Sequence, residues 1–270
     1  MISLTKDRRM LGYGSLSSYS NISHFVTTRQ GGYSEGTYSS FNCTPYSGDD
    51  EETVRKNQML LIEGMPHKPK ELVIPKQMHT TNCMLIEDIY LISSPQARKE
   101  MLNGIDAMMT HERGYCLCIS TADCVPVLVY DRKRNAVAAI HAGWRGTVGR
   151  LLDKTLHAMH DRFATMPEDV IACLGPSISL DAFEVGEEVY EAFRKCGFDM
   201  SRVCRWNRET EKHHIDLWEA NRIQLLEFGV PAGQIEVAGI CTYTHSDEFF
   251  SARRLGIQSG RILSGIMINE

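Results

Sequence analysis

Hydrophobic positions in this chain gather in short blocks, and the two most apolar blocks lie near its middle. Residues 125–130 and 136–140 are short, rich in valine, isoleucine and alanine, and separated by five polar residues, 131–135. This pattern predicts two strands joined by a polar turn, although apolar runs of this length also occur in buried helices. If the strands pair antiparallel, the start of one lies beside the end of the other. Cys124 and His141 would then share one end of a sheet.

The remaining blocks predict more strands than helices. The expected strands cover residues 22–28, 72–75, 83–87, 116–120, 170–174, 235–240 and 261–268. Periodic apolar positions predict helices over residues 51–64, 147–163, 186–195 and 217–228, and residues 95–102 form a short helix or turn. Thr147 is the expected cap of the helix over residues 147–163, and Asp216 with Glu219 has the spacing of a capping box. Because strands and helices do not alternate strictly, the pattern favours an α+β fold.

Composition narrows the class of protein. The chain has 270 residues, 43% of them hydrophobic, and shows no repeat or linker, so we expect a single domain over residues 1–270, with 1–20 as a loosely ordered N-terminal segment. A net charge of -5 argues against nucleic-acid binding. No stretch approaches a membrane span or a signal peptide, which predicts a cytoplasmic protein without a membrane partner. Nine cysteines without repeated close pairs are expected to be mostly small core residues.

Two soft donors at one sheet end suggest a metal site. Zinc binds nitrogen and sulfur donors, and a catalytic zinc keeps three protein ligands and one open position. Cys124 and His141 supply two ligands, and His79 is the best-placed third because it directly follows a predicted strand and precedes a polar turn. The spacing alone favours a simpler interpretation, in which Cys124 is a buried thiol and the histidines are hydrogen-bonded loop residues.

A third interpretation uses the same residues without a metal. Cys124 would be a nucleophile, His141 its base, and Asp106 or Asp123 the group that orients the histidine. Sequence spacing does not separate this hypothesis from the metal site.

Short motifs in a fixed order carry a resemblance to a known family. They lie at residues 27–34, 77–79, 121–127, 141–146, 173–178, 183–186, 241–242 and 249–254, and include Gln77-Met78-His79, Ala122-Asp123-Cys124 and His141-Ala142-Gly143-Trp144-Arg145-Gly146. The chain resembles the YfiH-type proteins nearly end to end. This family includes the bacterial YlmD and YfiH proteins and the mammalian FAMIN, once called multicopper polyphenol oxidases or laccases.

The resemblance implies a fold, an activity and a ligand set. The fold is a single α+β domain with mixed β-sheets packed face to face and helices outside. The activity is phosphorolysis of adenosine, inosine, guanosine and methylthioadenosine, together with hydrolytic deamination of adenosine. One zinc per chain would be held by His79, Cys124 and His141. Met78, Thr80 and Tyr33 depart from residues frequent in the family, but none of these departures removes a ligand.

The laccase name conflicts with the residues. Multicopper oxidases need many histidine ligands for several coppers, and the ten histidines of this chain do not suffice. A closed-shell zinc suits hydrolysis or group transfer, and a zinc-bound water is the expected nucleophile for deamination.

Phosphorolysis requires a held phosphate. The guanidinium candidates are Arg29, Arg145 and Arg253 or Arg254, because arginine matches phosphate oxygens. The predicted helix start after Arg145 would add backbone N–H groups, and Asp106 is a further candidate for substrate binding.

Two other functions stay open at this point. One is a cytoplasmic hydrolase that edits peptidoglycan precursors by removing a wrongly added amino acid from a nucleotide-linked sugar, a role also attached to bacterial members of the family. The other is a non-catalytic zinc-binding or partner-binding module. Assays with adenosine and phosphate, and with the amino-acyl nucleotide sugar, distinguish the first from a purine nucleoside enzyme. A closed zinc site with four protein ligands would favour the module.

Overall fold

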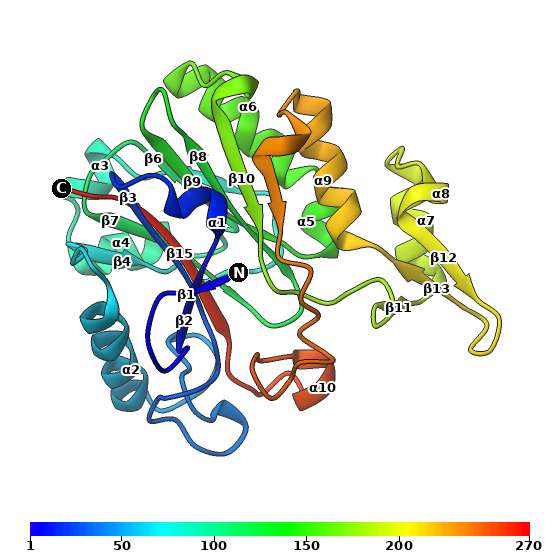
Figure 1. Ribbon diagram of the computed structural model, residues 1–270, viewed down its shortest axis with the longest axis horizontal. Helices are drawn as coiled ribbons and strands as arrows, with labels where there is room; N and C mark the ends of the chain where they lie inside the picture. The colour runs from blue at the N-terminus through cyan, green and yellow to red at the C-terminus, as the bar shows by residue number, and fades with distance from the viewer.

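The apolar blocks of the sequence form two six-stranded sheets in the computed structural model, which describes residues 1–270 (Figure 1). One sheet has the order β1-β2-β3-β15-β7-β4 and the other the order β14-β10-β8-β9-β6-β5. The strands of the first are β1 (Ile2–Ser3), β2 (Met10–Gly12), β3 (Ile22–Thr27), β15 (Ile262–Ile268), β7 (Tyr115–Thr121) and β4 (Glu71–Val73). Those of the second are β14 (Ile235–Val237), β10 (Val170–Leu174), β8 (Val125–Asp131), β9 (Ala136–Ala142), β6 (Ala107–Thr110) and β5 (Cys83–Leu85).

The two central apolar blocks pair as the sequence predicts. β8 and β9 are antiparallel neighbours, with Val125 opposite Ala142 and Asp131 opposite Ala136. Both strands are buried over their whole length because both faces of this sheet are covered. Each sheet is mixed: β4 pairs with β7 in parallel, as do β5 with β6 and β10 with β14, whereas the other pairs are antiparallel.

One of the two large buried clusters lies between the two sheets, which pack face to face. Leu128 of β8 and Ala139 of β9 belong to the same buried cluster as Ile119 of β7 and Ile266 of β15. A second cluster joins the opposite face of β8 and β9 to helices, and a third joins the opposite face of β7 and β15 to one helix. Helices therefore cover both outer faces, and the α+β fold with face-to-face mixed sheets is confirmed.

The helices are short apart from three. The chain forms α1 (Gly14–Ser17), α2 (Glu51–Gly64), α3 (Asp88–Ile92), α4 (Pro95–Met101), α5 (Trp144–Val148), α6 (Leu151–Phe163), α7 (Glu187–Lys195), α8 (Met200–Val203), α9 (Leu217–Phe228) and α10 (Ala252–Leu255), with 3-10 turns at Gly36–Tyr38, Pro167–Asp169 and Ala232–Gln234. Side chains of α6 and α9 pack on the sheet that contains β8, and Leu61 of α2 packs on the other sheet. No helix is long and apolar enough to cross a membrane.

The prediction of one helix over residues 147–163 is wrong. α5 begins at Trp144, directly after Gly143, and Thr147 lies inside it rather than at its cap. Arg150 then adopts a left-handed backbone conformation with φ of 60° and separates α5 from α6. Apolar periodicity does not detect this break, because a single residue in that conformation leaves the spacing of the apolar positions unchanged.

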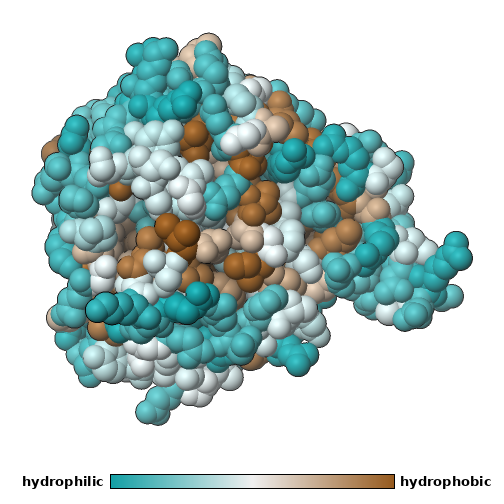
Figure 2. All heavy atoms as spheres, in the orientation of Figure 1, coloured by the Kyte–Doolittle hydropathy of each residue, from teal (hydrophilic) through white to brown (hydrophobic).

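A small third sheet was not predicted. It has the order β11-β13-β12, formed by Glu184–Val185, Lys212–Ile215 and Cys204–Asn207, and it projects from the body of the molecule beside α7 and α8 (Figure 1). Hydrophobic and polar residues do not alternate clearly in its three strands, so the sequence pattern did not predict them. Figure 2 shows this projection as mostly hydrophilic, whereas hydrophobic residues gather near the middle of the same face.

The N-terminal segment, for which we expected loose ordering over residues 1–20, joins the first sheet from Ile2 onwards, where β1 pairs with β2. β2 pairs with β3, and Leu11, Tyr13 and Leu16 are buried in the core between the sheets.

Candidate metal centre

Cys124 lies in the short turn that passes the chain from one sheet to the other. The turn joins β7 to β8, and its middle residue, Asp123, has a positive φ of 87°. The carboxylate of Asp123 accepts hydrogen bonds from the hydroxyls of Thr242 and Ser251, both at 2.7 Å, and from the backbone N–H of Arg253. These bonds tie the turn to α10 and to the segment before it. Asp123 therefore positions the turn and does not orient a histidine.

His141 lies beside this turn because of strand register. It is opposite Pro126, two residues from Cys124, near the end of β9. The prediction that Cys124 and His141 share one end of a sheet is confirmed.

His79 arrives from the other sheet. It follows β4 in a loop and has a positive φ of 58°, which is uncommon for a residue other than glycine. Gln77 anchors the loop to the end of β7, since its side chain donates to the carbonyl of Ser120 and accepts from the N–H of the same residue. The loop therefore stands in a fixed place although His79 itself is exposed.

The three side chains converge on one point. The ligand atoms of His79, Cys124 and His141 all lie within 4.8 Å of one another, and Cys124 Sγ is 3.8 Å from His79 Nε2. Gly143 permits this approach: a Cβ there would stand 3.0 Å from both Cys124 Sγ and His79 Cδ2. No other group of three or more such donors is found in the molecule.

Asp106 forms hydrogen bonds with two of the three donor residues, His79 and His141, on the side away from the pocket. It is fully buried, and its Oδ1 lies 2.7 Å from His141 Nδ1 and accepts from the backbone N–H of His79 at 3.1 Å. Its Oδ2 accepts from the N–H groups of Met78 and Thr80 and from the Thr80 hydroxyl. A carboxylate on Nδ1 leaves Nε2 of His141 free to bind a metal, as in many histidine-ligated zinc sites.

The charges at the site favour a thiolate. Burial by itself would raise the pKa of the Cys124 thiol, but the positive charge of His141 and hydrogen bonds from His141 and His79 lower this pKa to about 6. Burial would lower the pKa of His141, but the Cys124 thiolate and the Asp106 carboxylate raise it to about 9. Against burial, the hydrogen bond from His141 lowers the pKa of Asp106 to about 2. The thiolate is the form of cysteine that binds metals.

A pocket of about 400 Å³ opens in front of the three donors. Its walls come from both sheets and from the loops around them: Thr44, Tyr46, Pro75, Gln77, Ser120, Thr121, Ala122, Ala252, Ile257 and Arg261. Arg261 is the single arginine or lysine among the lining residues, and it was not among the arginines proposed from the sequence. Its Nη atoms donate to the carbonyls of Ile257, Ser259 and Gly260, whereas its Nε makes no such contact. Its place as the first residue of the last predicted strand, 261–268, was the available signal.

The four arginines proposed from the sequence do not line this pocket. Arg29 donates to the carbonyls of Ser39 and Ser246, and Arg145 is exposed with its guanidinium 4.3 Å from the Trp144 ring centre. Arg253 and Arg254 belong to the short α10. The former donates to the carbonyl of Glu184, and the latter lies over the ring of Tyr243.

Known proteins resemble the chain along nearly its whole length. Residues 23–269 match the protein family described as multi-copper polyphenol oxidoreductase laccase. A protein of Bacteroides thetaiotaomicron named purine nucleoside phosphorylase is 71% identical, with 100% of both chains covered. A protein named adenosine deaminase RL5, from an unknown prokaryotic organism, is 39% identical over 92% of this chain and 95% of its own. A purine nucleoside phosphorylase of Haemophilus influenzae is 34% identical over 91% of this chain and 94% of its own.

Solved structures show the same fold. YlmD from Geobacillus stearothermophilus superposes with a TM-score of 0.88 at 29% identity and covers 98% of both chains. The YfiH protein of Bacillus licheniformis superposes with a TM-score of 0.87 at 27% identity and covers 96% of both chains.

Proposed function

The chain belongs to the multi-copper polyphenol oxidoreductase laccase family, which includes the YlmD and YfiH proteins, and on this premise we propose that it is a zinc-dependent purine nucleoside phosphorylase that also deaminates adenosine. The convergence of His79, Cys124 and His141 at the floor of an open pocket carries the proposal. Relatives whose names state these two activities, one of them 71% identical over the full length, support it.

The donor set fits zinc. Imidazole nitrogen and thiolate sulfur are donors that zinc binds, three protein ligands leave the fourth position of a catalytic zinc open, and the carboxylate behind His141 fixes its tautomer. A zinc held there would act as a Lewis acid on the substrate or on a water molecule. Laccase chemistry needs several coppers, and one group of three donors does not provide their ligands. The proposal therefore departs from the name of the family.

Arg261 is proposed to hold the phosphate. It is the one arginine or lysine in the pocket wall, and the carbonyls that accept from its Nη atoms fix the guanidinium in place. Phosphorolysis transfers the ribose from the purine to a phosphate oxygen at C1′, so a positioned anion is the main requirement. His141 and Asp106 stay hydrogen-bonded beneath the site and hold the donors in place.

Metal analysis of the purified protein together with product identification tests the proposal. We expect about one zinc per chain. With phosphate, adenosine should give ribose 1-phosphate and adenine, and adenosine should also give inosine without a phosphate requirement. A protein that contains several coppers, or that leaves adenosine unchanged under both conditions, would overturn the proposal.

A further inference from the structure

Tyr46 links the metal pocket to two further hollows. It lines the 400 Å³ pocket in front of His79, and it also lines neighbouring hollows of about 370 and 320 Å³. Because the three share this side chain, they adjoin one another along one side of the molecule. The surface beside the metal pocket therefore offers more room than a purine nucleoside alone needs.

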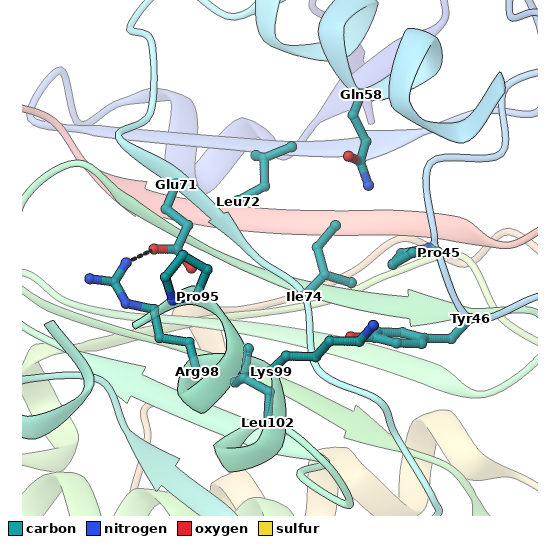
Figure 3. Close-up of a pocket in the computed structure, with 10 residues that line it drawn as sticks. All are labelled: Pro45, Tyr46, Gln58, Glu71, Leu72, Ile74, Pro95, Arg98, Lys99 and Leu102. Carbon is teal, nitrogen blue, oxygen red and sulfur yellow. Dashed lines mark hydrogen bonds and ion pairs between the residues drawn. The ribbon is translucent and has the colours of Figure 1, made fainter. Parts of the chain in front are cut away.

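Figure 3 shows the first of these hollows. Apolar side chains of β4 and α4 form part of its wall, and an ion pair between Arg98 and Glu71 crosses one end. Lys99 leaves α4 and extends beside Tyr46 at the other end, where it lines the second hollow as well.

The second hollow is positively charged. Lys76 and Lys99 line it, and neither ammonium group has a carboxylate within the 4.0 Å of an ion pair. Its one acidic residue, Glu100, instead accepts a hydrogen bond from Gln96. Three cationic side chains face two carboxylates in the two hollows, whereas the whole chain carries a net charge of -5. A local excess of positive charge on an acidic protein attracts anions.

We propose that this lysine subsite, formed by Lys76 and Lys99 beside Tyr46, binds the phosphoryl group of a phosphorylated purine nucleoside. The nucleoside portion then lies in the metal pocket. Lys76 immediately precedes Gln77, which lines that pocket, so their Cα atoms are only about 3.8 Å apart. The inference rests on the proposed function, and it extends the class of ligands that the site binds from nucleosides to nucleoside monophosphates.

Inhibition by AMP, measured during turnover of adenosine, tests the lysine subsite. The double variant Lys76→Ala with Lys99→Ala should raise the inhibition constant of AMP by about tenfold, the size expected from two exposed charge contacts. The KM for adenosine should stay within about twofold, because adenosine carries no phosphoryl group. The difference between wild type and variant should shrink as salt is added.

A matched control has the same loss of charge elsewhere. Lys56 and Lys154 are exposed on α2 and α6, and neither lines the metal pocket or the two hollows beside it. Lys56→Ala with Lys154→Ala should leave AMP inhibition unchanged. Equal effects of the two double variants would show that only net charge matters, and an equal rise in the adenosine KM would show a disturbed nucleoside pocket. Either result overturns the inference.

Direct calorimetric titration with AMP separates this inference from the proposed function. The wild type could bind AMP but leave adenosine unconverted, and the double lysine variant could bind AMP more weakly than the wild type. That result would refute the activity and retain the subsite. If the wild type converts adenosine and the double lysine variant binds AMP as tightly as the wild type does, the activity is retained and the subsite is refuted.

Discussion

The two sheets contribute to the site in different ways. The sheet that contains β8 and β9 supplies Cys124 and His141 at the ends of paired strands, where register places them side by side. The other sheet supplies His79 from the loop after β4 and Arg261 from the residue before β15. Backbone ladders fix the first pair, whereas side-chain hydrogen bonds fix the second.

The difference shows what each half of the site depends on. Asp106 and Gln77 hold the His79 loop through bonds to its backbone and to Ser120. Asp106 also binds His141, so one buried carboxylate connects a donor of each sheet. A fold with mobile loops would keep the cysteine and one histidine together and lose the third donor.

Removal of a donor should have the largest effect. His79→Ala, Cys124→Ala and His141→Ala should each lose the metal and nearly all activity, because two remaining donors do not hold a catalytic zinc. Metal content per chain and turnover of adenosine are measured on the same preparations. If Cys124→Ala retained its metal while turnover disappeared, the cysteine would be a nucleophile instead, as the alternative interpretation of the sequence holds.

Replacement of the pocket arginine should weaken one reaction more than the other. Arg261→Ala should keep the metal but reduce phosphate-dependent cleavage by roughly 10-fold to 150-fold, which corresponds to the loss of a charged contact of about 1.5 to 3 kcal/mol. Deamination, which uses water, should suffer less. The assay compares both reactions in the same variant.

Arg145→Ala is the variant with which Arg261→Ala should be compared. Because Arg145 is exposed and stacked on Trp144, we expect its loss to leave phosphorolysis nearly unchanged. A large loss in Arg145→Ala or Arg29→Ala, with a normal Arg261→Ala, would instead favour the arginines proposed from the sequence.

Neutralising the buried carboxylate of Asp106 should loosen the connection between His141 of one sheet and the His79 loop of the other. Asp106→Asn should weaken metal affinity by roughly 10-fold to 100-fold, since it alters the hydrogen bonds to His141 and to the His79 loop. A chelator competition measures the affinity. Asp131→Asn is the control, because Asp131 is equally buried and accepts backbone N–H bonds far from the donors. A similar loss in both variants would mean that general destabilisation is responsible.

A methyl group at Gly143 should lower metal affinity less than the loss of Asp106 does. Gly143→Ala places a Cβ 3.0 Å from Cys124 Sγ and His79 Cδ2, and the exposed His79 loop can yield more readily than the sheet. We expect metal affinity to fall several-fold, measured by the same competition. Gly233→Ala, where a Cβ meets nothing within 4 Å, should change nothing. Unchanged affinity in both would mean that the site has more room than this geometry indicates.

Much of the fold follows from local pattern. The strands β3, β7, β8, β9, β10 and β15 and the helices α2, α7 and α9 lie where periodicity predicted them, because each buries one or both faces. The pairing of β8 with β9 also followed, since a five-residue polar turn leaves few alternatives. The third sheet and the break at Arg150 did not follow, because neither depends on apolar spacing.

The sequence by itself determined the chemistry of the donors. Cys124 and His141 came from a hairpin argument, and His79 from its place after a strand and from family motifs. Tertiary structure decided the rest. It buried Asp106 beneath two donors, directed four candidate arginines elsewhere, and brought Arg261, which is 137 residues from Cys124, into the pocket. Donor type is a property of single residues, whereas the groups that surround the donors depend on how two sheets pack, and no local pattern encodes that packing.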